Sequence, residues 1–285
     1  MGTLYGCLPL HYSSSSSNRW RRFLRRCCRP SQLDIQYSAV QCKLLLSNPS
    51  RLYSLAALRQ KQQQSCARED PAFLLLLLLI LLLTGIGHAA ALQATGAATF
   101  AAAALAPLAL FFISALLIIP AAFVCLHRSS SASTSVSSGR SSSSSSGGPS
   151  PFDLAFSFDL HCNGSFVFAM YTQVVPLLLQ PLLLLLPAPV RKWLAAALHC
   201  YGFWCYTYVS AMGYLAVGRL KSAAPLLLSA FGCIAVVICC AAAGVDLSFC
   251  PTRLVLQAML NTAPVEPAVV AVPAITTAQP DLPLQ

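Results

Sequence analysis

The stretch Ala67-Arg68-Glu69-Asp70-Pro71-Ala72-Phe73 joins a basic, polar amino-terminal region to an apolar run that continues to Leu83. Pro71 lacks a backbone N–H and suits the first turn of a helix, and Asp70 just before it can cap the free backbone donors there. Glu69 and Asp70 also place negative charge at the positive end of the helix dipole. The sequence therefore predicts that a helix begins at this join.

The predicted helix is apolar enough to cross a membrane. A hydrocarbon core about 30 Å thick needs about 20 helical residues, so the predicted span covers residues 72–92. At a few tenths of a kcal/mol per Leu, Ile or Phe, the apolar run favours insertion by about 3–7 kcal/mol. We therefore expect an integral membrane protein.

The composition of the whole chain also indicates an integral membrane protein. Of its 285 residues 56% are hydrophobic and only 9% are charged, and the mean hydropathy is +0.67, so the charges are too few to cover a soluble globule. The formal charge is +10, and eleven of the 18 Lys and Arg precede Phe73. That distribution is typical of a juxtamembrane cytosolic segment on a lipid bilayer and disfavours nucleic-acid binding.

Further apolar segments predict an all-α, polytopic membrane protein with about five transmembrane helices. The expected membrane domain covers residues 67–260, with spans at residues 72–92, 102–126, 166–186, 193–217 and 225–243. Residues 129–151 are almost entirely Ser and Gly and predict a flexible linker. The Pro-rich tail, residues 261–285, is expected to be disordered.

The basic residues also predict an orientation. With a cytosolic amino terminus and five spans, 15 Lys and Arg lie on the cytosolic side and 3 on the other side. The positive-inside rule therefore favours a lumenal carboxyl terminus.

The amino-terminal region, residues 1–66, contains a single acid, Asp34, and six Arg between residues 19 and 29. Helical spacing over residues 32–59, broken at Ser47-Asn48-Pro49-Ser50, favours a retained cytosolic pair of helices that lies on the membrane or on a partner. A cleaved organelle presequence is the alternative. Cys27 and Cys28 are either palmitoylated or free thiols.

Two groups of residues are candidate functional sites. Asp159 and His161 precede the third predicted span, where they either cap the helix or handle an ion or substrate. Arg68, Glu69, Asp70 and Pro71 form either a partner-binding surface or a helix cap.

Asn163-Gly164-Ser165 is a glycosylation sequon. The predicted topology places Asn163 on the cytosolic side near the start of the third span, so we expect it to cap that helix and to carry no glycan.

The chain shows no pattern for catalysis, cofactors or metals. The 13 Cys form no CxxC pair and have no His at ligand spacing. No nucleophile with a base and an orienting group and no Gly-rich phosphate loop is evident. We therefore predict no cofactor and no enzymatic activity.

Four colinear blocks resemble the Unc-fifty (uncoordinated-50) family of Golgi membrane proteins. They are Gln32-Leu33-Asp34 with Tyr37 and Gln41; Ser47-Asn48-Pro49-Ser50-Arg51-Leu52-Tyr53; Ala67-Arg68-Glu69-Asp70-Pro71-Ala72-Phe73; and Phe158-Asp159-Leu160-His161 with Asn163. Gly213-Tyr214 also matches. The similarity extends over about residues 21–260, but the Ser run and the Pro-rich tail are insertions relative to the family.

The resemblance implies a Golgi-resident trafficking factor. Members of the family are linked to recruitment of large Arf guanine-nucleotide exchange factors and to delivery of membrane-protein cargo to the cell surface. The implied mechanism is scaffolding by the cytosolic amino-terminal helices. The alternative, a small transporter or channel, needs polar residues that face one another inside several spans, whereas the predicted spans contain mostly Leu, Ala, Ser and Cys.

Overall fold

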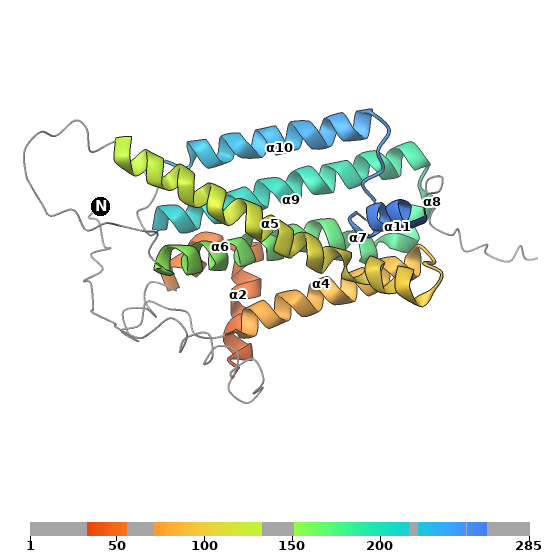
Figure 1. Cartoon of the computed structure of the whole chain (residues 1–285), viewed down its shortest axis with the longest axis horizontal. Coiled ribbons are helices and arrows are strands. Elements are labelled where there is room, and N and C mark those ends of the chain that lie inside the picture. Colours follow the sequence, from red (N-terminus) through yellow and green to blue (C-terminus); the bar gives the residue numbers. More distant parts are fainter. Residues whose placement is uncertain (1–32, 56–70, 133–150, 217–221, 249, 261–285) are drawn as a thin grey trace, which may run out of the picture.

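The computed structural model describes residues 33–55, 71–132, 151–216, 222–248 and 250–260, and these residues form helices and no strand (Figure 1). The helices are α2 (Ile35–Ser47), α4 (Ala72–Ala91), α5 (Ala97–Ala132), α6 (Pro151–Ala169), the π-helix η2 (Met170–Val174), α7 (Val175–Leu178), α8 (Gln180–Leu185), α9 (Ala188–Ala216), α10 (Ala224–Ala242) and α11 (Thr252–Leu260). A further short helix covers residues 49–55. The prediction of an all-helical chain is confirmed for this part of the sequence.

Two helices, α4 and the part of α5 over Ala97–Ala122, are long and apolar enough to cross a membrane. The apolar part of α10, Leu226–Ala242, is shorter. Two charged residues, Arg191 and Lys192, lie near the start of α9. The third predicted span is divided among several short helical elements. The five-span arrangement therefore stays a prediction.

The third predicted span, residues 166–186, is not one regular helix. Its chain passes from α6 through η2 into α7 and α8. Pro176 and Pro181 are the second residues of α7 and α8, and each lacks the N–H that would continue the hydrogen-bond ladder from the preceding turn. The π-helix precedes the first of them, and the Val175 N–H bonds to the Met170 carbonyl. The two prolines thus divide the segment while keeping it helical.

α5 is longer than its predicted span, residues 102–126. Its 36 residues extend about 54 Å, which exceeds the thickness of a hydrocarbon core. Pro107 and Pro120 lie inside it without ending it. Gly85 of α4 allows the two helices to approach closely, since a Cβ there would lie 2.0 Å from the Ala104 carbonyl oxygen.

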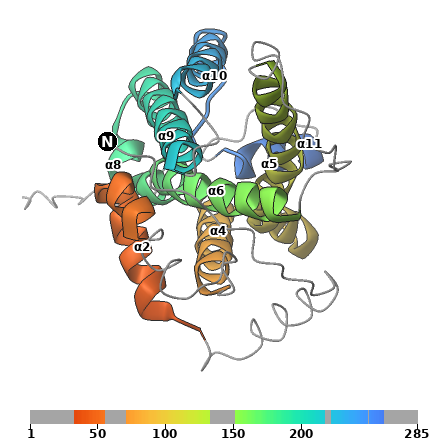
Figure 2. The ribbon, with the colours of Figure 1, turned by 90° about the vertical axis from the view of Figure 1, so that its left-hand side faces the viewer.

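The long helices α4, α5, α9 and α10 run roughly side by side, and α2 lies against α4 and α6 on the outside of the bundle (Figures 1 and 2). The main core joins α2, α4, α5, α6 and α9. It contains a T-shaped ring pair between Phe73 and Phe166, whose centroids lie 5.7 Å apart. Leu45 and Leu52 bring α2 and the helix over residues 49–55 into the same core.

The sequence predicted a pair of helices over residues 32–59 with a break at residues 47–50, and this prediction is confirmed where the structure describes it. The Asp34 carboxylate caps α2 by accepting from the Tyr37 N–H at 3.0 Å. α11 was not predicted. It packs on α4 and α5, and its Leu256 is buried among Ala89, Leu92, Ala103 and Ala104.

Candidate functional site

The join before α4 is described only from Pro71 onward, so Arg68, Glu69 and Asp70 lie outside the described residues. Pro71 is buried and stands immediately before the first residue of α4. Its carbonyl oxygen accepts a hydrogen bond from the Leu75 N–H at 2.9 Å. Pro71 therefore sits where the first turn of the helix closes.

Asp159 and His161 do not cap the start of a helix, and that prediction is wrong. α6 begins at Pro151, because the helix continues well ahead of the apolar segment, and both residues lie in its interior. Residues two apart on a helix point in different directions, so these two side chains do not form a facing pair. His161 is buried, whereas Asp159 is half-buried.

His161 is the centre of a polar cluster between α5, α6 and α9. Its Nδ1 lies 2.9 Å from the Tyr206 hydroxyl, and its Nε2 lies 3.4 Å from the Phe111 carbonyl oxygen and 3.3 Å from the Ser165 hydroxyl. The Phe111 carbonyl can only accept, so the contact of 3.4 Å requires a proton on Nε2. The imidazole also stacks on the Phe111 ring, with centroids 5.2 Å apart. His161 is thus held in place by partners from three helices.

Asn163, two positions after His161 in α6, makes a separate polar contact with α2. Its Oδ1 accepts a hydrogen bond of 2.6 Å from Nε2 of Gln41, and both side chains are buried. The prediction that Asn163 caps a helix start is wrong, because α6 begins at Pro151 and Asn163 lies in its interior. We name Ser114, His161, Ser165 and Tyr206 the His161 cluster; Gln41 and Asn163 form a separate pair.

A second polar cluster lies further along the same helices. Gln173 is in the π-helix η2, is buried, and donates from Nε2 to the Cys250 carbonyl oxygen at 2.6 Å. His88 of α4 is completely buried and interacts with the Gln173 side chain. Short π-helical segments are frequent at functional sites. Here the π-helix directs the Gln173 side chain toward the loop before α11.

An ion pair holds that loop. The Asp246 carboxylate accepts from Arg253 Nη1 and from the Ser248 N–H. Burial opposes ionisation of Asp246, but the bonds from Ser248 and the charge of Arg253 outweigh it, so the pKa of this carboxyl lies below its usual value. We name this set the Gln173 cluster; it consists of His88, Gln173, Asp246, Ser248, Cys250 and Arg253.

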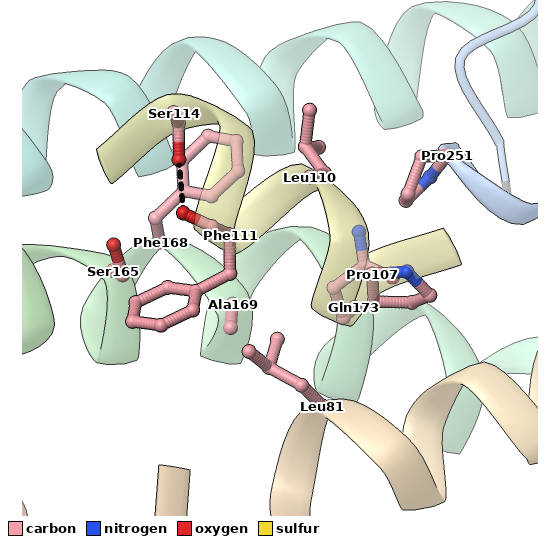
Figure 3. Close-up of a pocket in the computed structure, with 10 residues that line it drawn as sticks. All are labelled: Leu81, Pro107, Leu110, Phe111, Ser114, Ser165, Phe168, Ala169, Gln173 and Pro251. Carbon is pink, nitrogen blue, oxygen red and sulfur yellow. Dashed lines mark hydrogen bonds between the residues drawn. The ribbon is translucent and has the colours of Figure 1, made fainter. Parts of the chain in front are cut away.

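A small cavity of about 50 Å³ joins the two clusters (Figure 3). Ser114 and Ser165 lie toward one end, and Gln173 and Pro251 toward the other. Between them the walls are apolar and include Leu81, Leu110 and Phe168. We name it the α5–α6 cavity. At about 30 Å³ per water, it has room for one or two ordered waters.

The arrangement offers hydrogen bonding rather than covalent chemistry. Within the described residues, no group of three or more His, Cys, Asp or Glu could hold a metal ion. Among the described residues, the polar partners of His161 are hydroxyl and carbonyl groups, and no carboxylate contacts it. The hydrogen bonds of the two clusters therefore connect helices.

Several residues of these clusters and of the Gln41–Asn163 pair were not predicted as site residues. Gln41 stood among the family-like motif residues, and its spacing of four from the apolar Leu45 places both on one helix face. Asp246 and Arg253 are charged residues in an otherwise apolar segment, and that contrast could have marked them. Tyr206 and Gln173 carried no local signal, because their roles depend on other helices.

Comparisons with known proteins identify the family to which the chain is related. A search of curated proteins finds no significant match, and a search of solved structures also finds none. The model of the UNC-50 family matches residues 23–255, which is most of the chain and includes both clusters. The resemblance inferred from the four sequence blocks is thereby confirmed, and the chain belongs to the UNC-50 family.

Proposed function

We propose that the protein is a Golgi membrane protein that acts in vesicular trafficking. In this proposal it is a scaffold for a large Arf guanine-nucleotide exchange factor and for delivery of membrane-protein cargo to the cell surface. Membership of the UNC-50 family over residues 23–255 carries the proposal. The family is consistent with a Golgi-type membrane protein and is not a known enzyme family, so we propose a role without catalysis or cofactor.

The docking of α2 supports a scaffold. Gln41 bonds Asn163 of α6, and the Tyr53 hydroxyl donates to the Val209 carbonyl of α9 at 3.0 Å. These contacts fix the two amino-terminal helices on the bundle. The Arg-rich residues 19–29 precede α2 in sequence, so a partner that bound them would be held beside this platform.

Affinity purification of the full chain from mild detergent tests the scaffold. We expect a large Arf exchange factor among the bound proteins and a reduced amount after replacement of Arg21, Arg22, Arg25 and Arg26 by Gln. The matched control replaces Arg191 and Lys192 by Gln. Absence of any exchange factor, or equal recovery with the four-Arg variant, would contradict the proposed partner.

We propose five spans with a cytosolic amino terminus and a lumenal carboxyl terminus, based on the 15 and 3 basic residues of the two sides. Tags at the amino terminus and within residues 133–150 are expected to be digested by protease added to sealed microsomes. A tag after Ala243 is expected to be protected. Protection of the tag within residues 133–150 would overturn this topology.

A small transporter or channel is the second candidate, and the structure offers one observation in its favour. Polar side chains from α5, α6 and α9 face one another at His161, although the sequence had indicated mostly apolar contacts between the spans. The α5–α6 cavity is small, however, and the contacts within the His161 cluster are made mainly to one another. Solute or proton flux into proteoliposomes that is lost in His161→Ala would favour transport over scaffolding.

A further inference from the structure

Side chains with exchangeable protons follow one another along α6. Ser157, His161 and Ser165 are spaced four residues apart, so they lie on neighbouring turns of one side of the helix. Gln173 follows in η2 and lines the same cavity as Ser165. The segment from Ser157 to Gln173 extends about 24 Å, which approaches the hydrocarbon thickness of about 30 Å. These polar groups therefore extend over most of the thickness of a membrane.

Tyrosines of α9 connect the first of these groups. The Tyr206 hydroxyl lies 2.9 Å from Nδ1 of His161. The Tyr206 side chain also interacts with those of Ser210 and Tyr214, and Tyr214 interacts with the Ser157 side chain. Hydroxyl groups of α9 thus link Ser157 to His161. We name Ser157, Tyr214, Ser210, Tyr206 and His161 the α6–α9 polar path.

The α5–α6 cavity continues this path beyond His161. Nε2 of His161 lies 3.3 Å from the Ser165 hydroxyl, and Ser165 lines the cavity (Figure 3). Gln173 lines the other end, and its side chain interacts with His88 of α4. One or two waters in the cavity can bond Ser165 and Gln173, and they would then connect the surroundings of the two imidazole groups.

In the proposed topology this route runs from one side of the membrane to the other. Tyr206 lies about 16 Å from the cytosolic end of the proposed span 193–217, and Tyr214 lies close to that end. His88 lies close to the lumenal end of the span 72–92. The contact with Tyr206 then puts His161 near the middle of the bilayer, although the predicted third span begins only at residue 166. Ionisable side chains are rare at this depth and are typical of ion and proton routes.

The size of the cavity limits what can move along the route. Its volume of about 50 Å³ admits one or two waters, which is too little for a hydrated ion or an organic solute. Leu81, Leu110 and Phe168 line it between the polar ends and offer no ligand to a dehydrated cation. A proton needs no such space, because imidazole, hydroxyl groups and water can pass it along hydrogen bonds. The geometry therefore favours protons over larger solutes.

We propose that the α6–α9 polar path and the waters of the α5–α6 cavity conduct protons across the membrane. This inference rests on the proposed spans, deepens the transport candidate and does not involve the scaffold. Nε2 of His161 releases its proton to a cavity water, and Nδ1 takes a proton from the Tyr206 hydroxyl. Tyr206 regains a proton from the Ser210 and Tyr214 side, the water releases one at the Gln173 end, and the imidazole returns to its starting tautomer. Only protons move, and a counterion balances their charge.

Proton uptake by liposomes that contain the purified full chain tests the proposal. The liposomes hold a pH-sensitive dye and potassium chloride, and valinomycin lets potassium leave so that the charge is balanced. We expect the internal pH to fall several-fold faster than in liposomes without protein, whereas uptake of radioactive sodium should be the same in both. The result depends neither on the orientation of the protein in the liposome nor on an exchange factor, so it is separate from the test of the scaffold.

Hydroxyl variants make the test specific. Tyr206→Phe removes the hydroxyl that contacts His161 and keeps the ring, so it should lower the protein-dependent rate about tenfold. Ser165→Ala removes the hydroxyl between His161 and the cavity and should also lower the rate. The matched control is Tyr201→Phe, which removes a hydroxyl of α9 outside the path and should leave the rate unchanged.

Each variant is reconstituted after gel filtration shows a single species, and Ser165→Ala decides the test if Tyr206→Phe does not fold. A rate equal to that of empty liposomes would overturn the proposal. So would an unchanged rate in the folded path variants, or sodium uptake that rises together with proton uptake.

Discussion

The His161 cluster and the Gln173 cluster lie at opposite ends of the same cavity, but they are built from different groups. The His161 cluster is made of His, Ser and Tyr side chains that contact one another across α5, α6 and α9. The Gln173 cluster includes the Asp246–Arg253 ion pair and a backbone carbonyl as partners. The charged pair belongs to the loop and α11 beyond the predicted spans, where charge costs less than at membrane depth.

The comparison indicates two ways to attach a peripheral helix. α2 is attached by Gln41 to a neutral amide within the bundle. α11 is attached by Arg253 to a carboxylate in its own preceding loop, with Gln173 bonding the backbone between them. Removing one hydrogen-bond partner should therefore lower the free energy of unfolding more at α11 than at α2. At α11 the change leaves a buried charge without its partner, whereas at α2 it leaves a buried neutral amide.

The largest expected effect is that of Asp246→Ala. It leaves the Arg253 guanidinium buried without its carboxylate, which costs about 3–5 kcal/mol for a buried ion pair. The lower stability should be measurable as a lower thermal unfolding temperature of the variant in detergent. Maleimide labelling of Cys250, followed by peptide mass spectrometry, should increase as α11 separates from α4 and α5.

The pH dependence of the same pair provides a control. The folded pKa of Asp246 is lowered, so its stabilisation is complete above the unfolded value of about 4 and is lost as the pH falls through the folded value. The loss of stability caused by Asp246→Ala, measured by thermal unfolding, should therefore be the same at pH 7 and at pH 5. A smaller loss at pH 5 than at pH 7 would contradict the assigned role of Asp246.

The next effect is expected at α2. Gln41→Ala leaves the buried Asn163 amide without its partner, at a cost of about 1–3 kcal/mol. The double variant Gln41→Leu with Asn163→Leu removes both polar groups and should recover much of that loss. A double-mutant cycle measured by thermal unfolding gives the coupling energy. Additive effects of the two single changes would show that the bond does not hold α2.

A smaller effect is expected from packing within the His161 cluster. A Cβ at Gly164 would lie 2.7 Å from the Tyr206 ring, so Gly164→Ala must displace the ring that bonds His161, at about 1–3 kcal/mol. Gly232→Ala on α10 is the matched control, because no atom lies within 4 Å of its added Cβ. Gly232→Ala should be neutral or slightly stabilising, since Ala favours helix over Gly. Equal stability of the two variants would mean that Tyr206 is not held in place.

The sequence predicted the helices whose limits are set locally and missed the contacts that are set by other helices. The apolar run after Pro71 gave residues 72–92, and α4 covers Ala72–Ala91. The broken path through residues 166–186 was less predictable, because prolines inside membrane helices are often tolerated. α11 was missed because it is short and lies beyond the last apolar run.

The candidate site was the least predictable part. Gln41 and Asn163 are 122 positions apart, and no local pattern indicates that they meet. Asp159 and His161 were chosen as ionisable residues near a predicted span, and His161 lies in a polar cluster between helices. The motif over residues 158–163 therefore indicated which segment of the chain contributes to a polar cluster. It did not indicate which side chains contact one another.

The smallest expected effect is no change at all, and it concerns the sequon at Asn163. The predicted topology places this residue on the cytosolic side during synthesis, where the glycosylation machinery is absent. In the folded protein Asn163 is 2% exposed and bonds Gln41, so a glycan would also prevent α2 from docking. Protein made in cells should therefore show no mobility change on endoglycosidase treatment.

A positive control lies in the tail. Ile275→Asn creates an Asn-Thr-Thr acceptor in a segment that the same topology places in the lumen. This variant should acquire one glycan that endoglycosidase removes, while Asn163 stays unmodified in the same molecule. A glycan on Asn163 would place residues 133–150 in the lumen and remove the bond to Gln41. The orientation, the docked α2 and the cytosolic scaffold would then all be wrong together, because each requires Asn163 to be inaccessible from the lumen.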